Sequence, residues 1–306
     1  MKSAIITGGT GMIGCSLAEH LIKENVEVYV VTRPNSKRIN MLPRHPLLKV
    51  LECDLDNLDS FNLDGLHAVD AFFHLGWEGT TGEDRNNFYL QNKNVKYTLD
   101  AVGLAQRLNC TSFVFAGSQA QFGRVSGLLD GNLPSKPETA YGVGKLCAES
   151  MSRLLCNRLN IKHCSARILS IYGPNDGENT LVSYAIRKML KGEETSFTPC
   201  EQKWDYLYCK DAAKALYLIA LNGKHDGVYC LGSGKAEELK QYVETIKNII
   251  NPSAKVGIGN VPYAPNQVMM LCAEITDLKK DVGFEPDYSF DEGILETINW
   301  WKNKLL

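Results

Sequence analysis

Residues 2–14 read KSAIITGGTGMIG, a short apolar segment followed by a run of glycines. From Met12 onward the apolar residues follow helical spacing, so the glycines lie between a predicted strand and a predicted helix. In that setting Gly8 permits a tight turn, Gly11 lets a pyrophosphate approach the backbone, and Gly14 lets the helix pack closely on the strand. The first N–H groups of the helix suit phosphate oxygens. The stretch predicts a dinucleotide-binding site, with a plain tight turn as the alternative.

The rest of the chain alternates between strand and helix patterns. The expected elements are strands near 3–7, 27–31, 48–52, 70–74, 112–116 and 163–167 and helices near 12–24, 86–109 and 139–159. Such alternation is typical of a parallel sheet covered by helices on both faces, which binds ligands at the carboxyl ends of its strands. We therefore expect an α/β fold: a doubly wound parallel sheet (Rossmann fold) with a smaller C-terminal substrate-binding lobe.

The length of the chain also indicates two units. At 306 residues it exceeds the usual limit for one hydrophobic core, and beyond residue 170 the pattern becomes rich in turns. We expect a dinucleotide-binding domain over residues 1–170, to which residues 205–233 return. Residues 171–204 and 234–306 are expected to form the substrate-binding lobe.

A tyrosine and a lysine four residues apart, Tyr141 and Lys145, fall within the predicted helix over 139–159. Residues at this spacing share a helix face and can point into one cleft. A phenol with an ordinary pKa of about 10 is a poor proton shuttle at neutral pH, and a neighbouring ammonium favours the phenolate. The pair therefore indicates acid–base chemistry, with a surface Tyr–Lys pair as the alternative.

In this order and spacing, the motifs make the chain resemble the extended short-chain dehydrogenase/reductases, that is, the NAD(P)-dependent epimerase/dehydratase family, of the type that handles nucleotide-linked sugars. The resemblance covers nearly the whole length. The residues that carry it are Thr7–Gly14, Asp54-Leu55, Asn94-Val95, Thr98-Leu99, Phe115–Ser118, Tyr141–Lys145, Arg167, Tyr172–Pro174 and Asp205–Asp211. The resemblance implies an enzyme with a dinucleotide cofactor.

The resemblance also implies a role for each candidate site residue. Ser118 would hold the reacting oxygen, Tyr141 would be the general acid or base, and Lys145 would lower the Tyr141 pKa and bind the nicotinamide ribose. Asp54 would lie beside the adenine ring. The cofactor-binding residues that we expect are Gly8, Gly11, Met12, Ile13, Gly14, Arg33, Asp54, Leu55, Leu75, Tyr141 and Lys145.

The sequence departs from the family pattern at three positions. Phe122 stands where these enzymes often carry Tyr, and Gly117 replaces a common Ser or Thr. Both changes are expected to remove hydroxyls near the substrate while leaving the catalytic residues in place. Trp204 precedes Asp205 where many members have an Arg that touches the nucleotide sugar, so the nucleotide contacts are in doubt.

The residues that follow the second predicted strand indicate which dinucleotide to expect as the cofactor. It runs into the stretch 32–38, TRPNSKR, which offers no Asp or Glu to accept the ribose hydroxyls of NAD. Arg33 offers a planar fork for a 2′-phosphate and for stacking on adenine, and Lys37 and Arg38 add charge. We therefore expect NADP rather than NAD, although family members without the acid sometimes use NAD.

Composition excludes other classes of function. The net charge is −2 and Lys and Arg are dispersed, so neither a nucleic acid nor a membrane surface is an expected partner. The ten cysteines are scattered and form no CxxC pair, which indicates reduced thiols and no metal site. With no signal-peptide core and no long apolar segment, we expect a cytoplasmic protein that acts on a small molecule.

Three residues beside the predicted cofactor crevice are further candidates for a functional role. His74 ends a strand and is expected to be packed and hydrogen-bonded rather than an acid or base. Trp77 and Glu78 follow in a loop that could contact the substrate.

The same catalytic residues serve reductases, epimerases and dehydratases. Gln119-Ala120 follows Ser118 where dehydratases carry Asp-Glu, so dehydration is not expected. We expect reduction of a keto group on a nucleotide-linked deoxy sugar with NADPH, with an NAD-dependent nucleotide-sugar 4-epimerase as the main alternative. Less favoured are a reductase of a non-sugar carbonyl metabolite and a catalytically silent dinucleotide sensor. By analogy, a homodimer is expected through the helices near 86–109 and 139–159.

Overall fold

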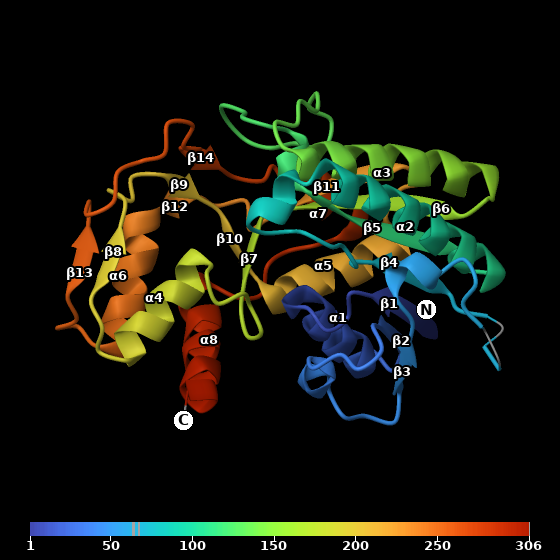
Figure 1. Cartoon of the computed structure of the whole chain (residues 1–306), viewed down its shortest axis with the longest axis horizontal. Helices are drawn as coiled ribbons and strands as arrows, with labels where there is room; N and C mark the ends of the chain where they lie inside the picture. Colours follow the sequence, from blue (N-terminus) through green and yellow to red (C-terminus); the bar gives the residue numbers. More distant parts are fainter. Residues whose placement is uncertain (63–64, 67, 306) are drawn as a thin grey trace.

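A parallel sheet forms the centre of the computed structural model, which describes residues 1–62, 65–66 and 68–305 (Figure 1). Its strands are β1 (Ser3–Thr7), β2 (Glu27–Thr32), β3 (Leu48–Glu52), β4 (Ala71–His74), β5 (Ser112–Ser118), β6 (Lys162–Ile168) and β11 (Gly227–Leu231). The seven strands lie in the order β11-β6-β5-β4-β1-β2-β3, and each neighbouring pair is parallel. Strand order reverses between β1 and β4, where such sheets open a ligand crevice. The expected doubly wound sheet is confirmed.

Helices cover both faces of this sheet (Figure 1). They are α1 (Met12–Lys23), α5 (Cys209–Asn222) and α7 (Thr276–Val282) on one face, and α2 (Phe88–Arg107) and α3 (Ala140–Arg158) on the other. Because both faces are covered, the strands are apolar on both sides, and every residue of β4 is buried. Alternate residues of one strand therefore enter different cores: Ile6 packs on the α1 side and Ile5 on the α2 side.

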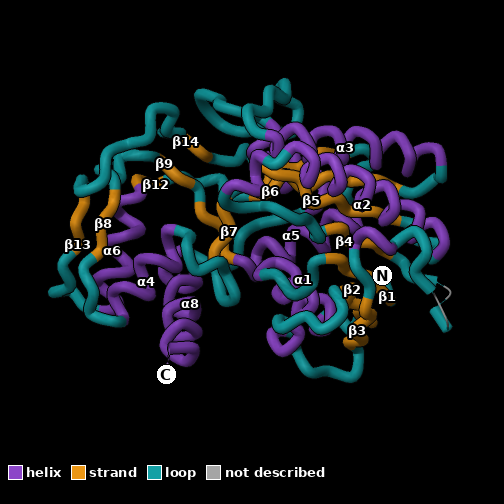
Figure 2. The backbone as a smooth tube through the Cα atoms, in the orientation of Figure 1, coloured by secondary structure: helices purple, strands orange, loops and turns teal. Residues whose placement is uncertain are grey.

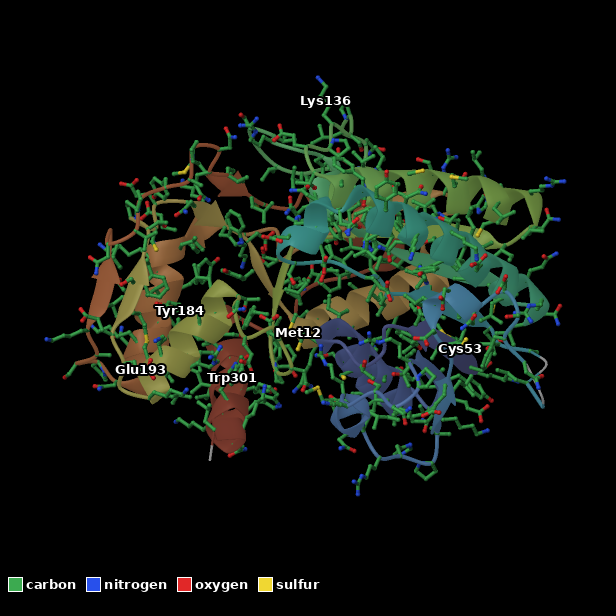
Figure 3. All side chains as sticks on the ribbon, viewed as in Figure 1. Met12, Cys53, Lys136, Tyr184, Glu193 and Trp301 are labelled. Atoms are coloured by element: carbon green, nitrogen blue, oxygen red, sulfur yellow. The ribbon has the colours of Figure 1, made fainter. Side chains whose placement is uncertain are left out.

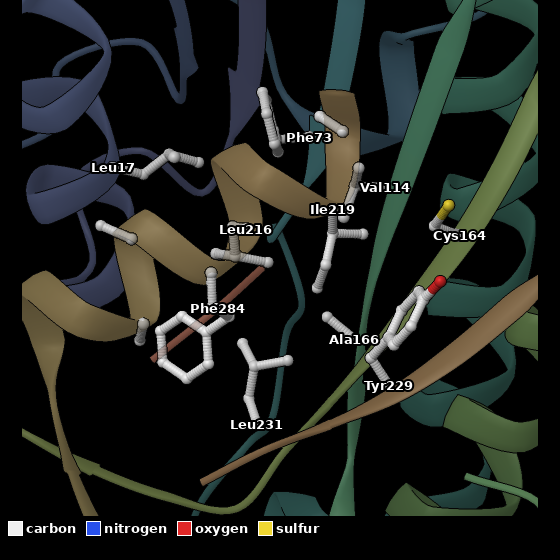
Figure 4. Close-up of a cluster of buried hydrophobic side chains, with 14 of the residues drawn as sticks. Leu17, Phe73, Val114, Cys164, Ala166, Leu216, Ile219, Tyr229, Leu231 and Phe284 are labelled. Atoms are coloured by element: carbon white, nitrogen blue, oxygen red, sulfur yellow. The ribbon is translucent and has the colours of Figure 1, made fainter. Parts of the chain in front are cut away.

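The core on the α1 side joins segments that are far apart in the sequence (Figure 4). Leu216 and Ile219 of α5 lie between Phe73 of β4 and Phe284, which follows α7. This packing attaches α5, β11 and α7 to the large domain. We assigned residues 234–306 to the lobe, but they include α7, which packs on the large domain. Residue 306 lies outside the described residues. The division into domains stays a prediction.

A smaller lobe lies beside the sheet, at the left of Figure 2. It comprises α4 (Leu181–Leu190), α6 (Leu239–Ile250), α8 (Phe290–Leu305), β8 (Thr195–Phe197), β9 (Lys203–Trp204), β12 (Glu237–Glu238), β13 (Val256–Ile258) and β14 (Met270–Leu271). The three helices pack on one another around Trp301, Val243 and Ile186. A two-stranded pair, β7 (Ser170–Tyr172) and β10 (Tyr206–Tyr208), connects the lobe to the sheet domain.

Two carboxylates hold the segments that join the two units. Asp205, which is fully buried, accepts hydrogen bonds from the backbone N–H groups of Ser233, Gly234 and Ala273 at 2.7, 3.1 and 3.0 Å. Asp211 accepts two backbone N–H groups from the segment before α8 at 2.9 and 3.2 Å. The segment 205–211 therefore holds the second lobe in place. This structural role explains why Asp205 and Asp211 are buried acids.

The described part of the chain shows no disulfide, no metal-binding cluster and no membrane-spanning helix. All ten cysteines are free, and Cys147 is the exposed one among them. No group of His, Cys, Asp and Glu among the described residues is placed to hold a metal ion. No described helix is both long enough and apolar enough to span a bilayer.

Candidate active site

Three cavities follow one another along the carboxyl ends of the strands. The first, of about 640 Å³, is lined by the glycine turn and by the ends of β2 and β4. It shares Leu75, Trp77 and Thr80 with the second, of about 430 Å³, which contains Ser118 and Tyr141. Leu169 borders both the second cavity and a third cavity, of about 620 Å³, in the smaller lobe. We call them the dinucleotide, catalytic and lobe cavities.

The glycine turn has the geometry that the sequence predicted. Gly8 has a φ of +71°, and a Cβ on Gly14 would lie 2.4 Å from the Gly8 carbonyl oxygen, so neither position admits a side chain. Gly11, by contrast, faces open space, and its nearest neighbour would be 3.4 Å from a Cβ. No side chain caps α1, and its first turn carries no acid. Its free N–H groups therefore suit a pyrophosphate.

The expected cofactor residues are distributed over two cavities. Gly8, Gly11 and Leu75 line both, and Met12, at the junction of the two units in Figure 3, lines the catalytic cavity with Ile13 and Gly14. Arg33 and Leu55 line the dinucleotide cavity. Asp54 does not belong to the described lining, whereas its neighbours on both sides do. Every expected cofactor residue except Asp54 thus borders these two cavities.

The far end of the dinucleotide cavity is cationic. Arg33, Ser36 and Arg38 line it, and Arg38 also donates to the backbone oxygen of Asn175 at 3.2 Å. Lys37, which the sequence grouped with them, is exposed and does not belong to the described lining. Two guanidinium groups and a hydroxyl therefore face the position where a phosphorylated ribose would lie in such a fold.

Ser118 ends β5 and caps the short helix η4 (Gln119–Gln121). Its Oγ accepts the Ala120 N–H at 3.2 Å, and its own N–H donates to the Gln121 Oε1 at 2.7 Å, which is a capping box. The Ser118 hydroxyl also hydrogen-bonds the Tyr141 side chain. This arrangement orients the hydroxyl pair into the catalytic cavity.

Tyr141 lies in the first turn of α3 and is 8% exposed. Its ring packs edge-on against Trp77 with centroids 6.1 Å apart, and the guanidinium carbon of Arg85 lies 4.4 Å from the ring centroid. Burial raises the pKa of Tyr141, while the Ser118 hydrogen bond and the charge of Arg85 act in the opposite direction. The sequence interpretation gave the charge effect to Lys145 and missed Arg85, which no motif singles out.

Lys145 is buried one turn further along α3. Its Nζ donates to the Ala116 carbonyl oxygen at 2.7 Å and lies 3.9 Å from the Trp77 ring centroid. Burial lowers the pKa of Lys145 to about 7, although Glu149 acts to raise it. Burial therefore disfavours the charged form of Lys145 in the folded chain.

A polar network behind Ser118 explains two departures from the family pattern. Glu149 binds Arg167 at 2.6 Å and accepts from Gln121 Nε2 at 2.9 Å, and both charged groups are buried. A Cβ on Gly117 would lie 2.6 Å from the Gln121 Oε1. Phe122 is buried, with the Arg167 guanidinium 4.6 Å from its ring centroid. Phe122 thus packs on this network, whereas Gly117 also lines the catalytic cavity. The expected loss of hydroxyls beside the substrate stays a prediction.

The histidine beside the crevice has a structural role, as expected. His74 Nδ1 and Nε2 lie 2.9 and 3.1 Å from the hydroxyls of Thr7 and Thr98. Burial and the charge of Lys145 lower its pKa to about 3, so the ring stays neutral. Glu78 lines the dinucleotide cavity and Trp77 lines both cavities, which places the loop after β4 over the cofactor side.

The lobe cavity has aromatic and amide walls. Trp204 and Tyr206 line it with Phe197 and Gln202, and the Trp204 indole donates to Ser170 Oγ at 2.7 Å. The described lining holds no Lys or Arg. Its one acid is Asp176, whose pKa is raised by burial. Trp204 stands where many family members have an Arg, and the described lining offers a diphosphate no other side-chain cation in its place.

We predict that replacing Lys145 by Met changes how stability depends on pH in protein stripped of dinucleotide. The folded-state pKa of about 7 lies below the ordinary value of 10.5, so the unfolded chain binds more protons in that window. Between about pH 7 and pH 10, the free energy of unfolding of the wild type minus that of Lys145→Met should increase by up to about 1.4 kcal/mol for each pH unit. Urea unfolding at several pH values measures this difference. A constant difference would contradict the prediction, and the exposed Lys136→Met serves as control.

Two curated relatives match almost the whole chain. The chain is 28% identical to a putative UDP-glucose 4-epimerase of Methanocaldococcus jannaschii, over 98% of each chain. It is 23% identical to a dTDP-4-dehydro-6-deoxyglucose reductase of Escherichia coli, over 96% of this chain and 95% of the relative.

Two solved structures share the fold. The UDP-N-acetylglucosamine 4-epimerase from Methanobrevibacter ruminantium M1, in complex with UDP-N-acetylmuramic acid, superposes with a TM-score of 0.89 at 23% identity, over 99% of both chains. The UDP-glucuronic acid 4-epimerase from Bacillus cereus, in complex with UDP-glucuronic acid and NAD, gives a TM-score of 0.83 at 20% identity, over 99% of both chains. The NAD dependent epimerase/dehydratase family model matches residues 4–232. The chain therefore belongs to the NAD dependent epimerase/dehydratase family.

Proposed function

We propose that this enzyme reduces a keto group on a nucleotide-linked sugar. The observation that carries the proposal is the order of the cavities: the cavity of the glycine turn shares Leu75, Trp77 and Thr80 with the catalytic cavity, and Leu169 borders both the catalytic cavity and the lobe cavity. A dinucleotide and a second ligand can thus approach the same hydroxyl pair from opposite sides. The relatives include nucleotide-sugar enzymes of both the epimerase and reductase type, which supports this substrate class.

The catalytic residues have the chemistry that such a reduction needs. A bound nicotinamide cofactor supplies the hydride. Tyr141 gives the proton to the carbonyl oxygen, and Ser118 donates a hydrogen bond that polarises the same oxygen. Lys145 stands behind the tyrosine and can bind a ribose hydroxyl once its Nζ leaves the Ala116 oxygen. The carbonyl must lie within about 3 Å of both hydroxyls for this transfer.

The cations of the dinucleotide cavity support NADP, whose exchange at each turnover suits a reductase. Arg33 and Arg38 line the cavity together with Ser36, and guanidinium groups of this kind suit a 2′-phosphate. The runner-up is an NAD-dependent 4-epimerase, which would oxidise and re-reduce one carbon. The epimerase relative and the NAD bound in the B. cereus structure favour that alternative.

The lobe cavity favours a third candidate, a reductase of an uncharged carbonyl metabolite. Its described lining has no cation to meet a diphosphate. The N-terminus of α4 also borders the cavity, but Thr180 caps it and donates to the Asp176 carboxylate. We place the nucleotide-linked sugar first because the relatives include nucleotide-sugar enzymes.

We further propose a homodimer formed through α2 and α3. Val143, Cys147, Met151 and Leu154 follow one another at helical spacing along α3, and all four are exposed. Leu154 is 60% exposed, more than Val143 or Met151. An apolar stripe of this kind is typical of a surface that a second chain covers.

We predict that Tyr141→Phe lowers kcat roughly 10²–10⁴-fold, because the variant loses the proton donor. Its dissociation constant for the dinucleotide should stay close to that of the wild type. Turnover is measured with dTDP-4-dehydro-6-deoxyglucose and with UDP-glucose as probes, and binding by fluorescence titration. Full activity of the variant would refute the assigned role. Tyr89→Phe, on a side chain that is 86% exposed, is the matched control.

We predict that Arg33→Asp weakens NADPH binding about tenfold or more, since it replaces a phosphate-binding fork by a negative charge. NADH binding should change much less. Lys37→Asp makes the same charge change outside the described cavity lining and should leave the preference intact. Equal affinities for both dinucleotides in the wild type would exclude a 2′-phosphate site. Copurified NAD that does not exchange would instead favour the epimerase.

We predict that the wild type has a molar mass in solution close to twice the 34.0 kDa of one chain. Leu154→Glu should shift it to the mass of one chain, because the substitution puts a charge into the apolar stripe. Leu128→Glu changes an equally apolar residue, 50% exposed, on a loop and should have no effect. Light scattering coupled to size exclusion measures the masses, and a monomeric wild type contradicts the prediction.

A further inference from the structure

Arg85 reaches the catalytic residues from the loop between β4 and α2. It belongs to the short helix η3 (Glu83–Asn86) and lines the catalytic cavity. Its guanidinium carbon lies 4.4 Å from the Tyr141 ring centroid, and its NH1 group donates to the Thr80 carbonyl oxygen at 3.1 Å. A backbone contact on one side and an aromatic face on the other hold the side chain in place, although the other three residues of η3 are exposed.

The other charged groups around Tyr141 are directed elsewhere. Lys145 lies 5.9 Å from the ring centroid and donates to Ala116, while Glu149, one turn further along α3, is bound by Arg167. Glu138, which precedes α3, forms an exposed ion pair with Arg124 at 2.8 Å.

The acids that neighbour Arg85 in η3 do not bind it. Glu83 is exposed, and Asp84 lines the dinucleotide cavity. The Ser118 hydroxyl and the Trp77 ring complete the surroundings of Tyr141 and carry no charge. Among the described groups that surround the phenol ring, Arg85 is thus the cation in direct contact with it.

We propose that Arg85 is a positioning residue that clamps the Tyr141 ring and keeps a permanent positive charge against it. This inference rests on the proposed role of Tyr141 as proton donor. A guanidinium is planar, so it can lie on an aromatic ring, and it stays charged at every pH at which the enzyme works. Lys145 does not occupy this position, because its Nζ lies 5.9 Å from the ring centroid and donates to the Ala116 carbonyl oxygen.

The clamp offsets the effect of burial on the phenol. A tyrosinate spreads its negative charge into the ring, so a cation on the ring face stabilises the ionised form. Without Arg85 the Tyr141 pKa therefore rises further. Proton transfer in either direction would then follow a pH profile displaced to higher pH, whichever reaction the enzyme catalyses.

The test measures ionisation of Tyr141 without any substrate. The full chain is labelled with 3-fluorotyrosine, which ionises at lower pH than tyrosine, and is titrated by fluorine NMR. The Tyr141 resonance is identified as the one that Tyr141→Phe lacks. We expect Arg85→Gln to raise the pKa at position 141 by about one unit, and Arg85→Lys to restore most of the wild-type value. Lys136→Gln removes a cation that points away from the molecule and should change nothing (Figure 3).

The outcomes separate this proposal from the function itself. An unchanged pKa in Arg85→Gln, in protein that unfolds at the wild-type temperature, overturns the clamp even if Tyr141 is catalytic. An equal rise in Arg85→Gln and Arg85→Lys also overturns it, since the charge would then not matter. Conversely, a shifted pKa in Arg85→Gln, restored in Arg85→Lys, supports the clamp even if no nucleotide-linked sugar turns over.

Discussion

The buried carboxylate of Glu149 is the interaction on which the catalytic end of the molecule depends. It projects from α3 and binds Arg167 of β6, Ser165 of the same strand, and Gln121 of η4. Through Gln121 it reaches the backbone of Ser118. One carboxylate therefore sets the distance between the strand that carries the serine and the helix that carries Tyr141. Removing a partner from a buried charge of this kind typically costs about 3–5 kcal/mol.

The glycine turn imposes a comparable constraint at the other end of the crevice. Gly8 and Gly14 touch closely enough that no side chain fits at either, which brings α1 directly onto β1. The N-terminus of α1 then opens into the cavity without a capping side chain. With rigid contacts on both sides, the loop after β4 and the smaller lobe are left to determine which ligand fits between them.

Burial gives the two central side chains opposite tendencies. It raises the pKa of Tyr141 and lowers that of Lys145, so both favour the neutral form in the folded chain. Arg85 adds a guanidinium that stays charged at every pH and lies against the Tyr141 ring. The pairing of Tyr and Lys on one helix face is therefore only part of the catalytic arrangement.

The sequence by itself determined the sheet, its helices and the position of the site. The elements from β1 to α3 lie within a few residues of the predicted ranges, because period-2 and period-3.6 apolar patterns are local properties of the chain. Ser118, Tyr141 and the glycine turn could be proposed as site residues because each belongs to a motif with fixed spacing, and the structure places all of them at the dinucleotide and catalytic cavities. Only the tertiary structure revealed Arg85, the Gln121–Glu149 network that occupies the space beside Gly117, and the cation-free described lining of the lobe cavity. These features depend on side chains from separate loops and strands meeting in space, and no spacing along the chain records such a meeting.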